Sequence, residues 1–249
     1  MSNIELKDIS FAYGENQNKI FSKLNLEFKK GEIFAIFAPN GTGKSTLLQY
    51  ILNSTTINKE NTIGYIPQKY NESFFNWLSI KNNIQLVKQK PIEQFKKNSL
   101  DISKTAKNLN INIDLNLRPL QCSGGMLQQA SILRAFSIKP NVIIADEPFA
   151  SLDYKIAKKI IYSMREMVQK NNMTMIVVLH NIEDIKNLCD RVLVIPSKPF
   201  STSEIEGHYQ ALIIENEFIK DNLNDYGDTN SFLNFVKDNL IVDTKVGKS

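Results

Sequence analysis

Residues 33–46 of this chain read IFAIFAPNGTGKST. The first five are an uninterrupted apolar run, as expected of a β-strand that is buried on both faces. A turn with two glycines follows, and the apolar residues after it fall at helical spacing. In a turn between a strand and a helix, backbone N–H groups and the helix dipole can bind phosphate oxygens. The stretch therefore predicts a phosphate-binding loop, in which Lys44 reaches the phosphates and Ser45 is available to ligate Mg²⁺.

The loop departs from the usual phosphate-binding pattern at one position. Ala38 stands where that pattern has glycine. The extra methyl group is tolerated if φ stays below zero, because it clashes mainly in left-handed backbone. We therefore expect the loop to bind phosphate in spite of the alanine.

A second apolar run, residues 142–145, ends in two carboxylates, Asp146 and Glu147. Asp146 can hold Mg²⁺ directly or through water, and Glu147 can position or deprotonate an attacking water. A strand that ends in Asp-Glu is by itself more often a solvated turn. The phosphate-binding loop upstream makes the catalytic interpretation the better one.

The composition is that of a folded globular protein. The chain has 249 residues, of which 42% are hydrophobic and 22% charged, so one or two domains are expected and a disordered or fibrous chain is excluded. The formal net charge of +4 is spread along the sequence. The charge therefore gives no reason to expect a nucleic-acid partner.

Cysteine and histidine are too sparse for a disulfide framework or a zinc site. The chain has only Cys122 and Cys189, with His180 and His208, and no two of them share a metal-ligand spacing. A reducing compartment is the expectation.

No segment has the pattern of a signal peptide or a membrane span. Residues 1–7 lack an apolar core, and the longest apolar runs, such as 175–179, are far below the ~20 residues that cross a bilayer. If the protein works at a membrane, another chain must supply the membrane part.

Strands and helices alternate along most of the chain, which predicts an α/β fold with a parallel sheet, an N-terminal antiparallel β subdomain and a helical insert. Strands are expected at 4–13, 20–28, 33–37, 142–145, 175–179 and 191–195, and helices at 44–52, 80–86, 103–109, 125–136 and 154–168. The expected domains are a phosphate-binding α/β domain, 1–200, with its core in 1–68 and 139–200 and a helical subdomain in 69–138, and a helical C-terminal extension, 201–249.

A third motif begins at Ser123 and reads SGGM before another predicted helix. This string resembles the signature of ATP-binding cassette (ABC) ATPases. The family's other motifs occur in the same order: Gln68 after a strand, Ser151-Leu152-Asp153 after the Asp-Glu pair, and His180 after the next strand. The resemblance covers nearly all of residues 4–199, and six ordered motifs are far more specific than one.

The resemblance implies a dimer that sandwiches ATP and Mg²⁺, either a homodimer or a pair with a second ABC ATPase. The motif of one chain then contacts the γ-phosphate bound by the other. By matching position, Tyr13 stacks on adenine, Gln68 senses Mg²⁺ and water, Glu147 is the base and His180 contacts the γ-phosphate. The implied ATP-binding residues are Tyr13, Pro39, Asn40, Gly41, Thr42, Gly43, Lys44, Ser45 and Thr46. The implied metal ligands are Ser45, Gln68 and Asp146. The residues implied to act across the dimer are Ser123, Gly124, Gly125 and Met126, and Asp153 belongs to the segment called the D-loop.

Several strings look like the ATPase subunits of nitrate, sulfonate and taurine importers, and of relatives for thiamine precursors. They include residues 146–153, 180–184 and 76–84. Three positions depart from that pattern: Cys122 stands where Leu is usual, Leu179 where Thr often precedes the histidine, and Asn181 where Asp follows it. None of these departures removes a catalytic group, but they leave the solute open.

The implied partners are membrane permease subunits, contacting the helical subdomain near Phe74, Phe75 and Trp77, and a solute-binding protein reached through the permease. This implies a peripheral position on the cytoplasmic side of the membrane. Two alternatives compete: a soluble ABC protein of DNA repair, chromosome organisation or translation, and a degenerate nucleotide-binding switch. The interval from Lys44 to Cys122 has no sustained heptads and the chain has one cassette, which disfavours the first alternative.

Overall fold

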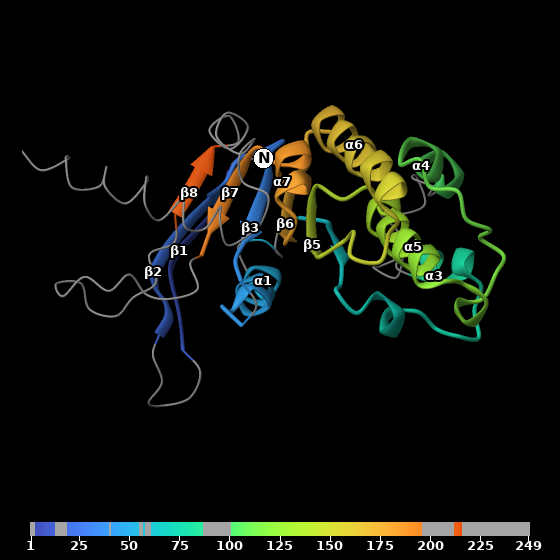
Figure 1. Cartoon of the computed structure of the whole chain (residues 1–249), viewed down its shortest axis with the longest axis horizontal. Coiled ribbons are helices and arrows are strands. Elements are labelled where there is room, and N and C mark those ends of the chain that lie inside the picture. The colour runs from blue at the N-terminus through green and yellow to red at the C-terminus, as the bar shows by residue number, and fades with distance from the viewer. Residues whose placement is uncertain are drawn as a thin grey trace, which may run out of the picture.

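A computed structural model describes residues 3–12, 19–39, 41–54, 57, 61–86, 101–195 and 212–215. Tyr13 and Asn40 lie outside these residues, as do most of the predicted C-terminal extension and His208. Figure 1 shows the strands gathered toward one end of the molecule and a group of helices at the other.

The centre of the fold is a six-stranded sheet with the order β4-β5-β6-β3-β7-β8. Five strands are parallel and β8 pairs with β7 in the antiparallel direction. The strands are β3 (Ile33–Phe37), β4 (Ile63–Ile66), β5 (Val142–Asp146), β6 (Thr174–Leu179), β7 (Arg191–Val194) and β8 (Leu212–Glu215). Because parallel strands end at the same edge, the segments that follow β3, β4, β5 and β6 meet there.

A second, two-stranded sheet contains β1 (Ile4–Ala12) and β2 (Lys19–Phe28), which are antiparallel. The α/β class with an antiparallel β subdomain, predicted from the sequence, is thus confirmed. The helices are α1 (Lys44–Asn53), α3 (Ile80–Leu86), α4 (Ile102–Asn108), α5 (Gly124–Ser137), α6 (Tyr154–Lys170) and α7 (Ile182–Leu188), with 3₁₀ turns η1 (Tyr70–Ser73) and η2 (Pro119–Gln121).

The sheet is buried on both faces, as the continuous apolar strands require. Along β3, Ile33, Ala35 and Phe37 pack with apolar residues of α5, α6 and α7, whereas Phe34 and Ile36 pack with those of β1, β2 and α1. Figure 1 shows α1 on one side of the sheet and α3, α4 and α5 together at the far end, beyond β5. The phosphate-binding loop and the insert are therefore held apart within one chain.

The prediction that the region after residue 200 is helical is wrong for its described part, since residues 212–215 form β8. The edge of β7 explains the difference: β8 satisfies its backbone groups, and Ile214 becomes 5% exposed opposite Val192. Arg191 adds an ion pair, with Nε 3.4 Å from Glu215 Oε1. A second difference is α7 (Ile182–Leu188), which is not among the helices expected from the sequence.

Arg191 links three parts of the chain. Its Nη1 donates to Glu32 Oε1 at 3.0 Å and to the Glu27 carbonyl at 3.2 Å, in addition to the ion pair with Glu215. Burial raises the pKa of the Glu32 carboxyl, and the nearby arginine opposes that rise. The small sheet, the turn before β3 and the last strand thus share one guanidinium.

Candidate active site

The loop between β3 and α1 has the backbone that a phosphate-binding turn needs. Gly41 has φ +80° and Gly43 has φ +88°, conformations that L side chains rarely adopt. Gly43 caps the N-terminus of α1, and Thr42 Oγ1 donates to the Pro39 carbonyl at 2.8 Å. Ala38 is not among the described residues with positive φ, so its methyl group is accommodated.

The first helical residue, Lys44, lies beside this loop and is 6% exposed. Its Nζ donates to the carbonyls of Ala38 at 2.9 Å and Pro39 at 2.8 Å. Burial lowers the pKa of the ammonium, and the carboxylates of Glu147 and Asp146 partly oppose that effect. The cation is therefore fixed at the loop and lies in the field of two acids from the end of β5.

Asp146 ends β5 and is 5% exposed. Its Oδ1 is buried without a hydrogen-bond partner, and its carboxyl is hydrogen-bonded to the Ser45 side chain. Burial, followed by the charge of Glu147, raises the pKa of Asp146, whereas Lys44 and Ser45 lower it. An unpartnered carboxylate oxygen beside a hydroxyl fits Mg²⁺, which prefers hard oxygen ligands and usually takes few from the protein.

No group of three or more His, Cys, Asp or Glu side chains that could hold a metal alone occurs in the part of the chain that the structure describes. Gln68, the third predicted metal ligand, is an exposed residue just after β4, which pairs with β5.

Glu147 and His180 are in direct contact, through Oε1 of the glutamate and Nε2 of the histidine. Glu147 has φ +48°, a conformation that costs energy in a non-glycine residue and lasts only where the surroundings fix it. Its N–H donates to the Val178 carbonyl at 3.1 Å, which holds it against the end of β6. The structure thus brings the predicted base and the predicted histidine together at the edge where Lys44 and Asp146 lie.

The signature segment, residues 123–126, lies at the start of α5 and not at the sheet edge that carries Lys44, Asp146 and Glu147. Ser123 is the N-cap of α5, and its Oγ accepts from the Met126 N–H at 3.3 Å. Gly125 lies against the D-loop so closely that a Cβ would be 3.1 Å from the Ser151 carbonyl. Asp153, which precedes α6, is exposed and makes no side-chain cap.

Three further side chains, which are not among the predicted site residues, make contacts in this region. Tyr70 Oη donates to Ser151 Oγ at 2.7 Å, Asn83 binds the backbone of Phe75, and Arg134 binds Ser73 at the end of η1. A local signal existed for Arg134, which interrupts the apolar helical sequence ILRAF. The contacts of Tyr70 and Asn83 had no comparable signal.

The aromatic residues after Gln68 do not form one surface. Phe74 is only 6% exposed, and the Arg134 guanidinium covers its ring at 4.4 Å from the centroid, so it offers less surface than its two neighbours to the predicted permease contact. Phe75 and Trp77 are 47% and 69% exposed, with ring centroids 4.9 Å apart. We call residues 75–79 the aromatic loop.

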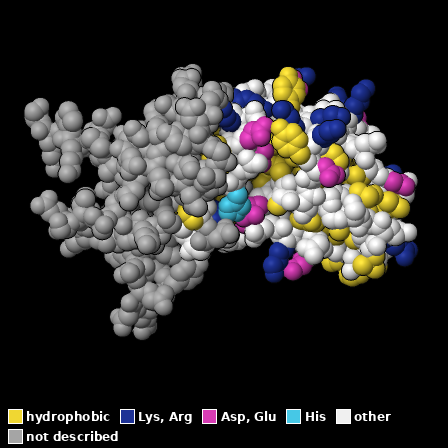
Figure 2. All heavy atoms as spheres, in the orientation of Figure 1, with side chains coloured by type: hydrophobic (Ala, Val, Ile, Leu, Met, Phe, Trp, Pro, Cys, Tyr) yellow, Lys and Arg dark blue, Asp and Glu magenta, His cyan; other side chains and the backbone are white. Residues whose placement is uncertain are grey.

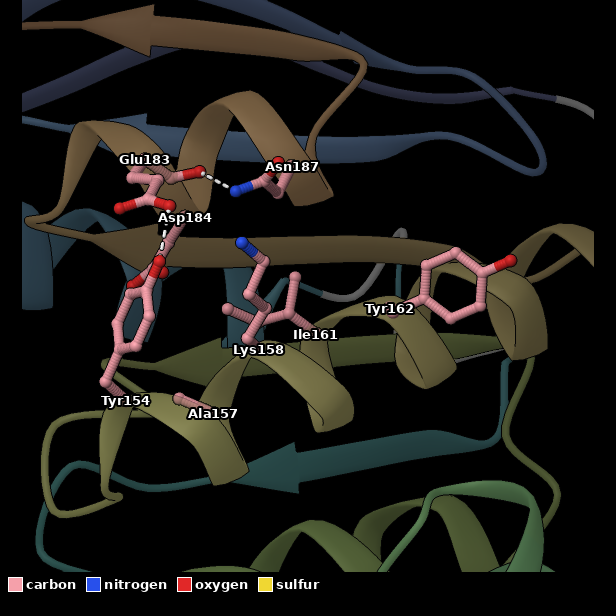
Figure 3. A pocket seen from close by; sticks show the side chains of 8 residues that line it. All are labelled: Tyr154, Ala157, Lys158, Ile161, Tyr162, Glu183, Asp184 and Asn187. Atoms are coloured by element: carbon pink, nitrogen blue, oxygen red, sulfur yellow. Dashed lines mark hydrogen bonds between the residues drawn. The ribbon is translucent and has the colours of Figure 1, made fainter.

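A separate hollow lies between α6 and α7, lined by Tyr154, Lys158, Tyr162, Glu183 and Asp184 among others (Figure 3). Its volume of about 110 Å³ is well below the 300–1,000 Å³ of typical small-molecule sites. Tyr154 Oη donates to Glu183 Oε1 at 2.9 Å, and burial together with Glu183 raises the pKa of Asp184 to about 6. In the space-filling view, exposed apolar and acidic side chains lie next to one another on this part of the surface (Figure 2).

Comparison with known proteins defines the class. The family model described as ABC transporter matches residues 21–150, more than half of the chain. The chain therefore belongs to the ABC transporter family, as an ATP-binding cassette. Its fold is similar to that of the MJ0796 cassette, solved as a dimer and described as a bacterial ABC transporter cassette, with a TM-score of 0.67 and 24% identity over 85% of this chain and 98% of that one.

Three relatives are named for import. The formylaminopyrimidine import ATP-binding protein ThiZ of Halalkalibacterium halodurans is 30% identical, over 79% of this chain and 80% of ThiZ. The Fe(3+) import protein FbpC of Fusobacterium nucleatum is 29% identical, over 77% of this chain and 55% of FbpC. The methionine import protein MetN of Clostridium acetobutylicum is 30% identical, over 77% of this chain and 65% of MetN. The chain thus spans little more than half of FbpC and just under two thirds of MetN.

Among the described residues, no helix is both long and apolar enough to cross a membrane.

Proposed function

We propose that the chain is the ATP-hydrolysing motor subunit of an ABC importer, driving transport through separate membrane subunits. The observation that carries the proposal is the meeting of five side chains at one sheet edge. Lys44 and Ser45 come from the loop after β3, Asp146 and Glu147 from the end of β5, and His180 follows β6. Phosphate binding, metal binding and water activation need these groups within reach of one another.

The chain's own residues divide the work. The loop of residues 38–46 binds the triphosphate through backbone N–H groups and Lys44, and Tyr13 stacks on the adenine. Ser45, Asp146 and Gln68 hold Mg²⁺, which neutralises phosphate charge when bound. Glu147 accepts the proton of the attacking water, and His180 orients the carboxylate that it already contacts.

Dimerisation is part of the proposal because Ser123 is remote from its own loop. The signature residues begin α5 in the helical insert, whereas α1 lies across the sheet (Figure 1). A second cassette would bring its Ser123, with Gly124, Gly125 and Met126, to this nucleotide, and Asp153 would lie near the contact. The relative MJ0796 was solved as a dimer, also with ADP and Pi bound, which supports this arrangement.

The aromatic loop is the proposed contact for the membrane subunits, which puts the protein at the cytoplasmic face of a membrane. The exposed rings of Phe75 and Trp77 contact each other at an interplanar angle of 46°, and large aromatic side chains often anchor interfaces. The relatives are named for formylaminopyrimidine, iron and methionine import, and the motif strings favour a small anion such as nitrate, a sulfonate or taurine, delivered by a solute-binding protein.

Glu147→Gln tests the catalytic assignment. The amide keeps the shape of the side chain but cannot accept a proton, so turnover should fall ~10²–10⁴-fold while ATP binding remains. Size-exclusion chromatography should then reveal an ATP-dependent dimer. Glu166→Gln, on the exposed side of α6, is the matched control and should hydrolyse ATP normally. Normal turnover by a monomeric Glu147→Gln protein would refute the assignment.

Trp77→Ser tests the partner assignment. Pull-down from detergent-solubilised host membranes should lose a multi-span membrane protein that the unmodified chain retains. Tyr162→Ser is the control, since Tyr162 is 65% exposed on α6, away from the aromatic loop. Equal capture by both variants would remove the aromatic loop from the interface.

A further inference from the structure

Arg134, on α5, forms charged hydrogen bonds with Ser73, which lies just before the aromatic loop. Among the described side chains of α5, it is the one that does so. Its Nη1 donates to the Ser73 carbonyl at 2.6 Å and its Nη2 to Ser73 Oγ at 2.7 Å. The same guanidinium covers the Phe74 ring. A two-point hydrogen bond plus stacking fixes both position and orientation, which a lysine could not do.

The far side of the aromatic loop is held as firmly. Asn83, on α3, is 2% exposed; its Nδ2 donates to the carbonyls of Phe75 at 3.1 Å and Ser79 at 3.0 Å, and its Oδ1 accepts from the Phe75 N–H at 2.8 Å. One buried amide therefore sets the shape of the loop, while Arg134 supplies the charged hydrogen bonds that join the preceding segment to α5.

The opposite end of α5 is the signature segment. Ser123 caps the helix that carries Arg134, three turns further along. One continuous helix thus joins the residue proposed to sense the partner cassette's nucleotide to the loop that carries Phe75 and Trp77.

We propose that Arg134 is a positioning residue that couples the aromatic loop to the signature helix, so that nucleotide engagement at Ser123 alters the surface that Phe75 and Trp77 present. The inference rests on the proposed function for the meaning of that surface. The coupling itself needs only nucleotide and a second copy of this chain, and no membrane subunit. Loss of the arginine leaves the loop shaped by Asn83 and removes its charged hydrogen bonds to α5, while the packing of η1 and α3 against α5 remains.

Trp77 is the only tryptophan of the chain, so its fluorescence reports on the loop without a label. The experiment uses the full chain carrying Glu147→Gln, with acrylamide quenching of Trp77 measured as ATP and Mg²⁺ are added. We expect a quenching change on ATP binding that Arg134→Met abolishes. ATP affinity, followed separately with a fluorescent nucleotide, should stay within about twofold, because Arg134 contacts no residue of the phosphate loop.

Arg165→Met is the matched control. Arg165 is also partly buried, and it donates to the backbone carbonyls of Leu188 and Cys189 and to the carboxylate of Asp190. It lies on α6, away from the aromatic loop. It should keep the ATP-dependent change. An unaltered Trp77 response in Arg134→Met would overturn the proposal, and so would a parent chain that binds ATP and dimerises without any Trp77 response.

Ser73→Ala serves if Arg134→Met does not fold, because it deletes one of the two hydrogen-bond acceptors and nothing else from the guanidinium contact. A reduced response supports the coupling, and an unchanged response overturns it. Failure of the proposed function would give a different result. If Trp77→Ser still captures the same membrane protein but the quenching response still depends on Arg134, the coupling exists and the assigned membrane contact is wrong.

Discussion

The sheet edge and the aromatic loop reach their fixed shapes by different means. At the sheet edge, the backbone does most of the positioning: strand register aligns β3, β5 and β6, and the positive φ angles of Gly43 and Glu147 direct the chain. In the aromatic loop, side chains position the backbone, through Asn83 and Arg134. A site built by the backbone should lose chemistry but keep its shape when a side chain is changed, whereas a loop built by side chains should lose its shape.

Ser123→Arg is expected to have the largest effect, loss of ATP hydrolysis, because the bulky cation blocks the approach of a second cassette. Nucleotide binding by the monomer should be nearly unchanged. Mixing this variant with Lys44→Ala gives heterodimers in which one site carries both lesions and the other carries neither, so activity should return in part.

Single-turnover measurement on the isolated heterodimer checks that result. No recovery there, despite a demonstrated mixed dimer, would contradict sites shared between chains.

Lys44→Ala should weaken ATP binding roughly 10- to 150-fold, the equivalent of losing a charged hydrogen bond worth about 1.5–3 kcal/mol. The free energy of unfolding should also fall, by about 1–3 kcal/mol, because the carbonyls of Ala38 and Pro39 lose the ammonium that donates to them. Isothermal calorimetry measures the affinity, with exposed Lys155→Ala as the control. Equal affinities in the two variants would remove the loop from phosphate binding.

Asn83→Leu should lower the free energy of unfolding by about 1–3 kcal/mol, because backbone groups of the aromatic loop lose their buried partner. Basal ATPase should persist. Asn82→Leu, on the exposed side of the same helix, should stay within about 0.5 kcal/mol of the parent in urea unfolding. If the two variants unfold alike, the loop is not built by its side chains in the way that the comparison requires.

Asp184→Asn should have the smallest effect and should leave both regions intact. The folded-state pKa of about 6 lies above the ordinary value of 3.8, so the folded protein holds this proton more tightly and loses stability as pH rises from about 4 to 6. The amide removes that loss, which for a partly exposed group is about 1 kcal/mol or less. Thermal melts should therefore favour the variant at pH 8 and not at pH 4; a benefit at pH 4 would contradict the assignment.

The same contrast explains what could be predicted from the sequence. Lys44, Asp146 and His180 follow strands whose apolar runs are visible locally, so their shared edge follows from parallel topology. The different burial of neighbouring Phe74 and Phe75 could not be foreseen, because it depends on Arg134, which lies far along the chain. The same holds for β8, because its short apolar run, residues 212–214, does not show that it will pair with the edge of β7.

The central position of β3 has a consequence for synthesis on the ribosome. This strand is made early, is wholly buried in the finished sheet, and takes both of its neighbours from segments that begin at Thr174 and Arg191. Until those segments emerge, its apolar residues and backbone edges have no native partner, which is the situation in which nascent chains aggregate or recruit chaperones. A fragment that stops before β6 would keep the entire phosphate-binding loop and still lack the sheet that holds it.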